Sequence, residues 1–364
     1  MIEKLKNSTF YHKVFHWEYW PFSVFYVPIF FYWLWLSMKA RSLFFFSASN
    51  PSIESGGMLG ESKFDILEKI RPHYKPATIL VKAPATSDTL KPLLKAAGIS
   101  FPLIAKPDKG ERGWLVEKIS DWDALSRYFS PVQGDFIIQG YVDFPLEAGV
   151  FYYRFPGEAS GHISSVVLKD FLKIRGDGRS TVLKLMNLYP RARFQVHVLR
   201  EKYPDLMKQI PAAGSVVELV PIGNHCKGTT FLNGNHLINE QLVAVFDEIS
   251  RSIEGFYYGR FDLRCPTIED LYAGRHIRVM ELNGAGAEPG HIYQPGFSII
   301  EAYRVIFAHW QVLYRISRQN HTSGVPYMTW KGVRETMSQY KQYKKINSQR
   351  AETAALGPLH SQLT

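Results

Sequence analysis

GRFDLRC (residues 259–265) and HIRVMELNGAGAEPG (residues 276–290) are the two halves of the stretch from which the fold of this chain can be worked out. Both halves show the alternation of polar and apolar side chains that is typical of a β-strand. The interval between them, residues 267–274, is polar and ends in a glycine, which suits a hairpin connection. We therefore expect two neighbouring antiparallel strands here.

Polar side chains on these two strands can meet. Because side chains alternate across a strand, Arg260 and Asp262 fall on one face of the first strand, and Glu281 and Asn283 share a face of the second. Antiparallel pairing would bring an Asp, a Glu and an Asn together, and oxygen ligands of this kind hold Mg²⁺ beside nucleotide phosphates. The alternative interpretation is a solvent-facing hairpin whose charges are merely hydrated.

A second motif concerns phosphate binding. FPLIAKPDKGERGWLVEKI (residues 101–119) predicts a strand that delivers Lys106, a loop bounded by Gly110 and Gly113, and a returning strand. Glycine permits the close backbone approach that folds N–H groups over phosphates, and the lysine adds a point charge.

Together these motifs resemble the ATP-grasp ligases, the superfamily of D-alanine:D-alanine ligase. The run GDGRST (residues 176–181), followed by an apolar helix, is similar to a segment in the ATP-grasp part of cyanophycin synthetase. In related synthetases a Gly-Thr segment lies beside the active site, which makes His225 and Lys227 either substrate or phosphate contacts or part of a surface loop. The resemblance covers about residues 61–310 and implies an α+β ATP-grasp fold, in which two lobes clamp ATP between antiparallel sheets.

The resemblance and the composition divide the chain into four parts. We expect a membrane-associated or interfacial segment at residues 1–45, a short region before the grasp at 46–100, the ATP-grasp domain at 101–310, and C-terminal helices with a disordered tail at 311–364. Within the grasp, lobe one is expected at about residues 101–140 and lobe two at about 141–310.

The resemblance also implies a reaction: ATP phosphorylates a carboxylate, and an amine then attacks the acyl phosphate. No side-chain nucleophile is required. The residues implied as ligands of one or two Mg²⁺, or of Mn²⁺ in its place, are Asp262, Glu281 and Asn283. The catalytic side chains implied are Lys106, with Lys169 or Lys173, for binding the phosphates, and Arg260 for stabilising the transferring group or the intermediate.

Nucleotide contacts are implied for a second group of residues. In the resembled family, backbone groups at the hinge between the lobes bind adenine, here those of Tyr141 and Val142, and a following Glu, here Glu147, holds the ribose. Gln139 stands where the family usually has an acid, which departs from the pattern. Lys63, at the head of a predicted helix, is either an ATP contact or an ordinary exposed lysine.

The charge balance favours anionic partners. Lys and Arg number 43 against 33 Asp and Glu, so the net charge is +10. A nucleic-acid binder is not expected, because basic and acidic residues are interspersed and no zinc-finger or RNA-recognition pattern occurs. The two cysteines, Cys226 and Cys265, suggest a reducing compartment without a disulfide framework.

The segment Tyr19 to Met38 has no charged residue and is crowded with aromatic side chains. Its 20 residues of helix would just cross a hydrocarbon core, yet Pro21 and Pro28 interrupt it, and Tyr and Trp favour the headgroup level. An interfacial helix, a re-entrant helix, a span, a signal peptide and a buried core helix remain the alternatives. Since the reaction consumes ATP, we expect a cytoplasmic protein at the inner face of the membrane, with an anionic membrane surface as partner.

The expected function is that of an ATP-dependent carboxylate–amine ligase, similar to D-alanine:D-alanine ligase, with a small-molecule carboxylate and an amine as substrates. The α/β domain that precedes the grasp in D-alanine ligases is reduced here to a short segment. We therefore expect an acceptor or product at the membrane rather than D-alanine itself. Two alternatives from other classes are a non-catalytic, membrane-anchored nucleotide-binding protein and a structural protein that docks on anionic lipid.

Overall fold

The computed structural model describes residues 17–111, 113–129, 134–220, 223 and 228–355. The candidate contacts His225 and Lys227 lie outside the described residues, as does most of the predicted disordered tail.

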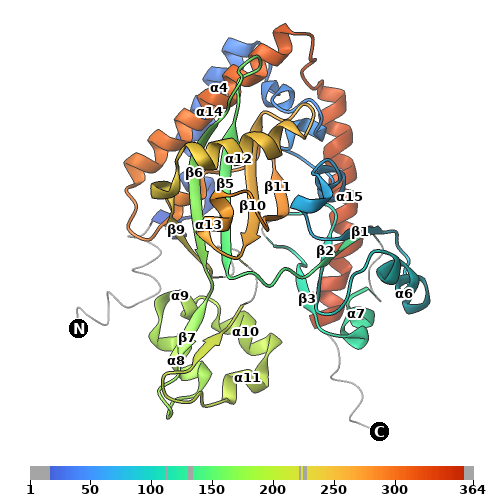
Figure 1. The fold of residues 1–364 in the computed structure, drawn as a ribbon, viewed down its shortest axis with the longest axis vertical. Coiled ribbons are helices and arrows are strands. Elements are labelled where there is room, and N and C mark those ends of the chain that lie inside the picture. The colour runs from blue at the N-terminus through green and yellow to red at the C-terminus, as the bar shows by residue number, and fades with distance from the viewer. Residues whose placement is uncertain (1–16, 112, 130–133, 221–222, 224–227, 356–364) are drawn as a thin grey trace.

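The strands of the described residues form three antiparallel sheets (Figure 1). Their orders are β11-β10-β5-β6-β9, β1-β4-β2-β3 and β7-β8. The strands are β1 (Thr78–Val81), β2 (Leu103–Pro107), β3 (Glu117–Ile119), β4 (Phe136–Gly140), β5 (Leu146–Tyr153), β6 (His162–Asp170), β7 (Lys173–Arg175), β8 (Val216–Glu218), β9 (Thr230–Asn233), β10 (Tyr258–Cys265) and β11 (Arg278–Asn283).

Helices cover these sheets. The α-helices are α3 (Phe22–Phe25), α4 (Val27–Ala40), α5 (Lys63–Glu68), α6 (Ser87–Ala96), α7 (Trp122–Phe129), α8 (Val182–Leu188), α9 (Pro190–Arg193), α10 (Val196–Lys202), α11 (Pro204–Lys208), α12 (Glu240–Arg251), α13 (Ile268–Tyr272), α14 (Ile299–Thr322) and α15 (Trp330–Ala355). The 3₁₀ helices are η1 (Trp17–Tyr19), η2 (Phe45–Ala48), η3 (Glu54–Gly56), η4 (Pro72–Tyr74), η6 (Asn235–Leu237) and η7 (Gly290–Tyr293).

The five-stranded sheet is packed on both faces. On one face, α12 and α13 cover it, and the rings of Phe246 and Phe261 lie 5.4 Å apart. On the other face, α4 and α14 cover it, with Leu313 of α14 in the same cluster as Phe151. Alternation along β5 explains the division, because Val150 belongs to the first cluster and its neighbour Phe151 to the second.

β10 and β11 pair antiparallel, as the sequence predicts, with Arg260 opposite Asn283 and Asp262 opposite Glu281. A β-bulge follows Asp262 and bends the strand locally. The connection is not the plain hairpin turn that the sequence suggested, since it contains α13. The helix forms because the Thr267 side chain caps it, accepting a hydrogen bond from a backbone N–H in its first turn.

Two smaller units adjoin this sheet. The four-stranded sheet packs against α6 and α7, and α15 runs beside it in Figure 1. The hydroxyl of Tyr343 on α15 accepts from the backbone N–H of Asp108 at 3.0 Å, which fixes the helix to the end of β2. The second unit combines β7 and β8 with α8 to α11. Its helix α8 follows residues 176–181, as predicted, and Thr181 is its N-cap.

The N-terminal aromatic segment forms two helices rather than one. Pro21 precedes α3, and Pro28 lies in the first turn of α4, where a missing N–H is tolerated. At 14 residues, α4 is about 21 Å long, against about 30 Å for a hydrocarbon core. Among the described residues, no helix combines the length and the apolar character of a membrane span. α4 lies against α14, where the Tyr32 hydroxyl donates to Oε1 of Gln311 at 3.1 Å.

Candidate functional site

Asp262 of β10 is the centre of a buried polar cluster. Nη2 of Arg260 and Nδ2 of Asn283 donate to its Oδ2 at 2.9 Å and 3.1 Å. Nζ of Lys169 on β6 lies 3.1 Å from its Oδ1. Gly149 of β5 lies opposite Asp262, and a Cβ at that position would come within 3.0 Å of Oδ1. The glycine therefore leaves room for the carboxylate on this face of the sheet.

A second carboxylate, Glu147 of β5, extends the cluster. Nζ of Lys169 donates to its Oε1 at 3.1 Å, and Nε of Arg264 donates to its Oε2 at 2.7 Å. Lys169 therefore links two carboxylates, those of Glu147 and Asp262. Both oxygens of Glu147 hold cations in this structure, and its contact with ribose stays a prediction.

The third carboxylate, Glu281 of β11, pairs with Lys63. Lys63 is the first residue of α5, which begins here because the side chain of Ser62 accepts from the backbone N–H of Asp65. The side chain of Lys63 is 15% exposed, so it is not the solvated surface lysine of the alternative interpretation. The helix thus delivers a cation to one of the predicted metal ligands.

Lys106 connects the two larger sheets. It lies on β2, is buried, and donates to Oε1 of Gln139 on β4 at 3.1 Å. It also donates to the backbone oxygen of Met280 on β11, in the other sheet, at 3.0 Å. Nε2 of Gln139 donates in turn to the hydroxyl of Thr78 at 3.1 Å. The cluster around Asp262 therefore lies where the two sheets meet, which is the arrangement that a clamp around a ligand needs.

Ion pairing and burial together determine the charge states of the cluster. Burial by itself would raise the pKa of Asp262, but Arg260 and Lys169 outweigh it and lower that pKa to about 2. Burial also opposes ionisation of Glu281, and Lys63 lowers its pKa. For Lys106 burial dominates and lowers the pKa to about 8. Both carboxylates are thus ionised at neutral pH, whereas Lys106 loses its charge in mild alkali.

The donor set fits a hard divalent cation. Asp262, Glu281 and Asn283 offer two carboxylates and a carboxamide on neighbouring strands, the oxygen chemistry that Mg²⁺ prefers. Oδ1 of Asp262 is buried without a hydrogen bond of good geometry, although Lys169 lies nearby. Among the described residues there is no group of three or more His, Cys, Asp or Glu placed for a metal. A metal held here would therefore need further oxygen ligands, such as those of a phosphate chain.

One predicted catalytic residue lies elsewhere. Lys173 begins β7, is exposed, and pairs with Asp170 at 3.2 Å. The sequence placed it with Lys169 because the two are close in the chain, but the chain leaves the five-stranded sheet after β6 and enters the small β7–β8 unit. The structure therefore gives Lys173 no contact with the cluster around Asp262.

The predicted hinge and loop contacts are only partly positioned for nucleotide. The backbone oxygen of Val142 accepts from Nη1 of Arg264 at 2.7 Å, and the Tyr141 hydroxyl lies 3.5 Å from the same atom. Gly110 and Gly113 bound the loop between β2 and β3 with φ of 153° and 69°, conformations that favour glycine. Adenine and phosphate contacts at these four residues stay predictions.

Two residues of this region were missed from the sequence. Arg264 continues the alternation of Arg260 and Asp262, so the period of two could have found it. Asp108 is buried, and its Oδ1 accepts from the Ser62 hydroxyl and from the backbone N–H of Phe64, both at 2.9 Å. It ties the end of β2 to the head of α5, and no local sequence pattern signals this long-range contact.

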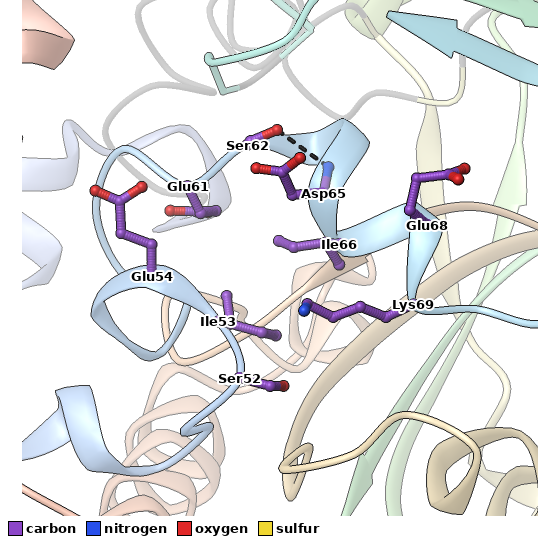
Figure 2. A pocket seen from close by; sticks show the side chains of 9 residues that line it. All are labelled: Ser52, Ile53, Glu54, Glu61, Ser62, Asp65, Ile66, Glu68 and Lys69. Atoms are coloured by element: carbon purple, nitrogen blue, oxygen red, sulfur yellow. Dashed lines mark hydrogen bonds between the residues drawn. The ribbon is translucent and has the colours of Figure 1, made fainter.

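A pocket of about 410 Å³ lies beside α5, with Asp65, Ile66 and Glu68 of this helix in its lining (Figure 2). Four of its nine lining residues are acidic, namely Glu54, Glu61, Asp65 and Glu68, and Figure 2 draws all nine. Asp262, Glu147 and Glu281 are not among its lining residues. Lys63, on the same helix, pairs with Glu281. We assign no ligand to this pocket.

Solved structures that resemble this chain come from ATP-grasp enzymes, the superfamily whose motifs the sequence resembles. A D-alanine–D-alanine ligase from Bacillus anthracis has 15% identity and a TM-score of 0.38, over 72% of this chain and 67% of that one. The VanG D-Ala:D-Ser ligase from Enterococcus faecalis has 11% identity and a TM-score of 0.40, over 70% of this chain and 61% of that one. A bifunctional glutathione synthetase from Pasteurella multocida has 15% identity and a TM-score of 0.35, over 68% of this chain and 35% of that one.

No protein-family model and no curated protein matches the sequence. The structural matches are loose and span 35% to 67% of those longer chains.

Proposed function

We propose that this protein is an ATP-dependent carboxylate–amine ligase that works through an acyl phosphate. The observation that carries the proposal is the buried cluster around Asp262, in which two sheets bring carboxylates and cations together. Buried charges are costly unless they are paired, and such clusters with shifted pKa values are common at functional sites.

The residues divide into those for metal and those for phosphate. Asp262, Glu281 and Asn283 would hold Mg²⁺, which when bound neutralises phosphate charge and fixes the orientation of the transferring group. Lys106 and Arg260 supply positive charge for the phosphate chain from opposite sheets. Their burial strengthens this stabilisation, because a charge acts more strongly where water is excluded.

The proposed reaction has two steps. An oxygen of the substrate carboxylate attacks the γ-phosphorus, the bond between that phosphorus and the ADP oxygen breaks, and an acyl phosphate forms. The amine nitrogen then attacks the acyl carbon, phosphate leaves with the electrons of the carbon–oxygen bond, and the amine releases a proton to solvent. Arg260 and Lys169 stabilise the negative charge that develops in both steps.

The substrate proposal is that the enzyme resembles D-alanine:D-alanine ligase in reaction type but uses an acceptor or product at the membrane. The support is the sequence from Tyr19 to Met38, which has no charged residue and is crowded with aromatic side chains. An aminoacylated lipid or an envelope precursor would suit such a position. Offering soluble amino acids and lipid amines separately to the full-length protein tests this, because higher activity on soluble amino acids would contradict a membrane acceptor.

The ligase proposal is tested by a screen for ADP release in the presence of Mg²⁺. Amino acids, dipeptides and lipid amines are offered singly and in pairs, with Glu281→Gln as the blank. We expect ADP only when a carboxylate and an amine are both present. Equal ADP release from the blank, or release that needs no substrate, would contradict the proposal.

The alternative is a non-catalytic, membrane-anchored nucleotide-binding protein. Its support is Gln139, which replaces the acid usual in the resembled family and accepts a hydrogen bond from Lys106. This alternative predicts Mg²⁺-dependent ATP binding without ADP release for any substrate pair, so the same screen distinguishes the two.

A further inference from the structure

The N-terminal helices present an apolar surface that no described part of the protein covers. Six of its side chains are between 44% and 71% exposed: Val24, Val27, Phe30, Phe31, Trp35 and Met38. On α4 these residues recur at intervals of three and four, so they share one face of the helix. Singly exposed apolar residues are ordinary, but a contiguous aromatic row marks an interaction surface.

The opposite face of α4 already packs on the protein. Ile29 and Leu36 are buried in clusters that include α14, and the rings of Tyr32 and Phe307 lie 4.7 Å apart. α4 is therefore apolar on both faces, whereas α14 covers only one. A helix that is apolar all round is stable when its second face also leaves water.

The charges around this face select the partner. Between Glu18 and Glu54 the sequence contains no acidic residue, and the exposed Lys39 and Arg41 close α4. Nζ of Lys39 lies 4.2 Å from the centre of the Trp35 ring, a pairing suited to the headgroup level of a bilayer. Apolar rings beside cations, without acids, complement a surface of anionic lipid.

We propose that the outward face of α3 and α4 binds the surface of an anionic lipid bilayer, with α4 lying in the plane of the membrane. The helix is too short to cross the bilayer, and its aromatic row with flanking cations suits the interface. The inference does not rest on the ligase proposal, since vesicle binding and ADP release are measured separately.

Flotation of the full-length protein with vesicles tests this proposal. Vesicles of phosphatidylcholine alone are compared with vesicles that also contain phosphatidylglycerol. The double variant Phe30→Ser/Phe31→Ser should lower binding at least about tenfold, because two exposed rings no longer enter the interface. The matched control is Val198→Ser/Ile210→Ser, which removes two apolar residues that are 55% and 57% exposed in the β7–β8 unit and should bind like the wild type.

Quenching of tryptophan fluorescence by brominated lipids gives a second readout. Part of the quenching should disappear in Trp35→Phe, a change that keeps the helix apolar. Absence of binding to either kind of vesicle would overturn the proposal, as would equal binding by the two double variants. Concentration-dependent self-association that Phe30→Ser/Phe31→Ser abolishes would also overturn it, because the face would then belong to a second copy of the chain.

Discussion

Two lysines only four residues apart, Lys169 and Lys173, show how differently this protein uses basic residues. The side chain of Lys169 is 7% exposed and contacts two carboxylates, those of Glu147 and Asp262. The side chain of Lys173 is 42% exposed and pairs with Asp170. Density of basic residues therefore does not identify the site, whereas burial against carboxylates from several strands does.

The energetics of the two kinds of ion pair differ in the same way. An exposed pair such as Lys173–Asp170 contributes about 0–1 kcal/mol, since water screens it. Removing one partner from a buried pair costs about 3–5 kcal/mol, because the other charge is left uncompensated. Substitutions in the cluster should therefore affect both stability and activity, and substitution of the exposed Lys173 neither.

The largest effect is expected for Asp262→Asn. The variant keeps the shape of the side chain but leaves Arg260 and Lys169 without their shared carboxylate. ADP release should fall at least about 10²-fold, because one ligand charge for the metal is lost. Denaturant unfolding, followed with the same sample, shows whether the variant is still folded. A folded variant with wild-type ADP release would contradict the assignment of Asp262.

Glu147→Gln should mainly reduce stability. Lys169 and Arg264 lose a charged partner, so the free energy of unfolding should fall by about 3 kcal/mol. The matched control is Glu158→Gln, which removes an exposed carboxylate paired with His162 and should change it by less than about 0.5 kcal/mol. Urea unfolding measures both changes. If the two substitutions lowered the free energy of unfolding equally, the claim that buried ion pairs stabilise this protein more than exposed ones would be wrong.

The pH dependence of ATP binding tests Lys106. Its pKa is lowered to about 8, so the side chain loses its charge as the pH rises through that value. If it holds phosphate, the Kd for ATP should rise about tenfold between pH 7 and pH 9. In Lys106→Arg the guanidinium stays charged, and the profile should be flat. If the Kd of Lys106→Arg for ATP rose with pH as much as that of the wild type, another group would be responsible for the titration.

Lys106 also makes the free energy of unfolding depend on pH. Its folded pKa of about 8 lies below the ordinary value of 10.5, so the unfolded chain binds the extra proton between these pH values. The contribution of Lys106 to stability therefore increases as the pH rises through this window. Urea unfolding at several pH values measures this rise in the free energy of unfolding. The rise should be absent in Lys106→Met.

The smallest effect is expected for Lys173→Met, which should change ADP release by less than about twofold because the residue is exposed. Lys169→Met should lower it at least about 10²-fold, since a buried cation beside two carboxylates is lost. Similar losses in both variants would show that the two lysines act together.

The pairing of β10 with β11 could be predicted because it follows from local patterns. Alternation placed Arg260 and Asp262 on one face, and the polar interval that ends in Gly274 indicated a connection between neighbouring strands. The helix α13 in their connection was missed because its only signal is the capping residue Thr267.

Contacts between distant segments could not be predicted from such patterns. Asp108 accepts from Ser62 and Phe64, and Lys106 reaches Met280 across the two sheets. These contacts depend on how the sheets pack, which no local period encodes. The position of Lys173 has the same origin, because the point at which the chain leaves a sheet is set by tertiary structure.

Electron paramagnetic resonance of Mn²⁺, used in place of Mg²⁺, can measure whether the cluster holds a divalent ion together with ATP. Wild-type protein and Lys173→Met should bind Mn²⁺ in the presence of ATP. The double variant Asp262→Asn/Glu281→Gln should lose this binding while remaining folded. Unchanged Mn²⁺ binding in the folded double variant would show that β10 and β11 do not hold the metal.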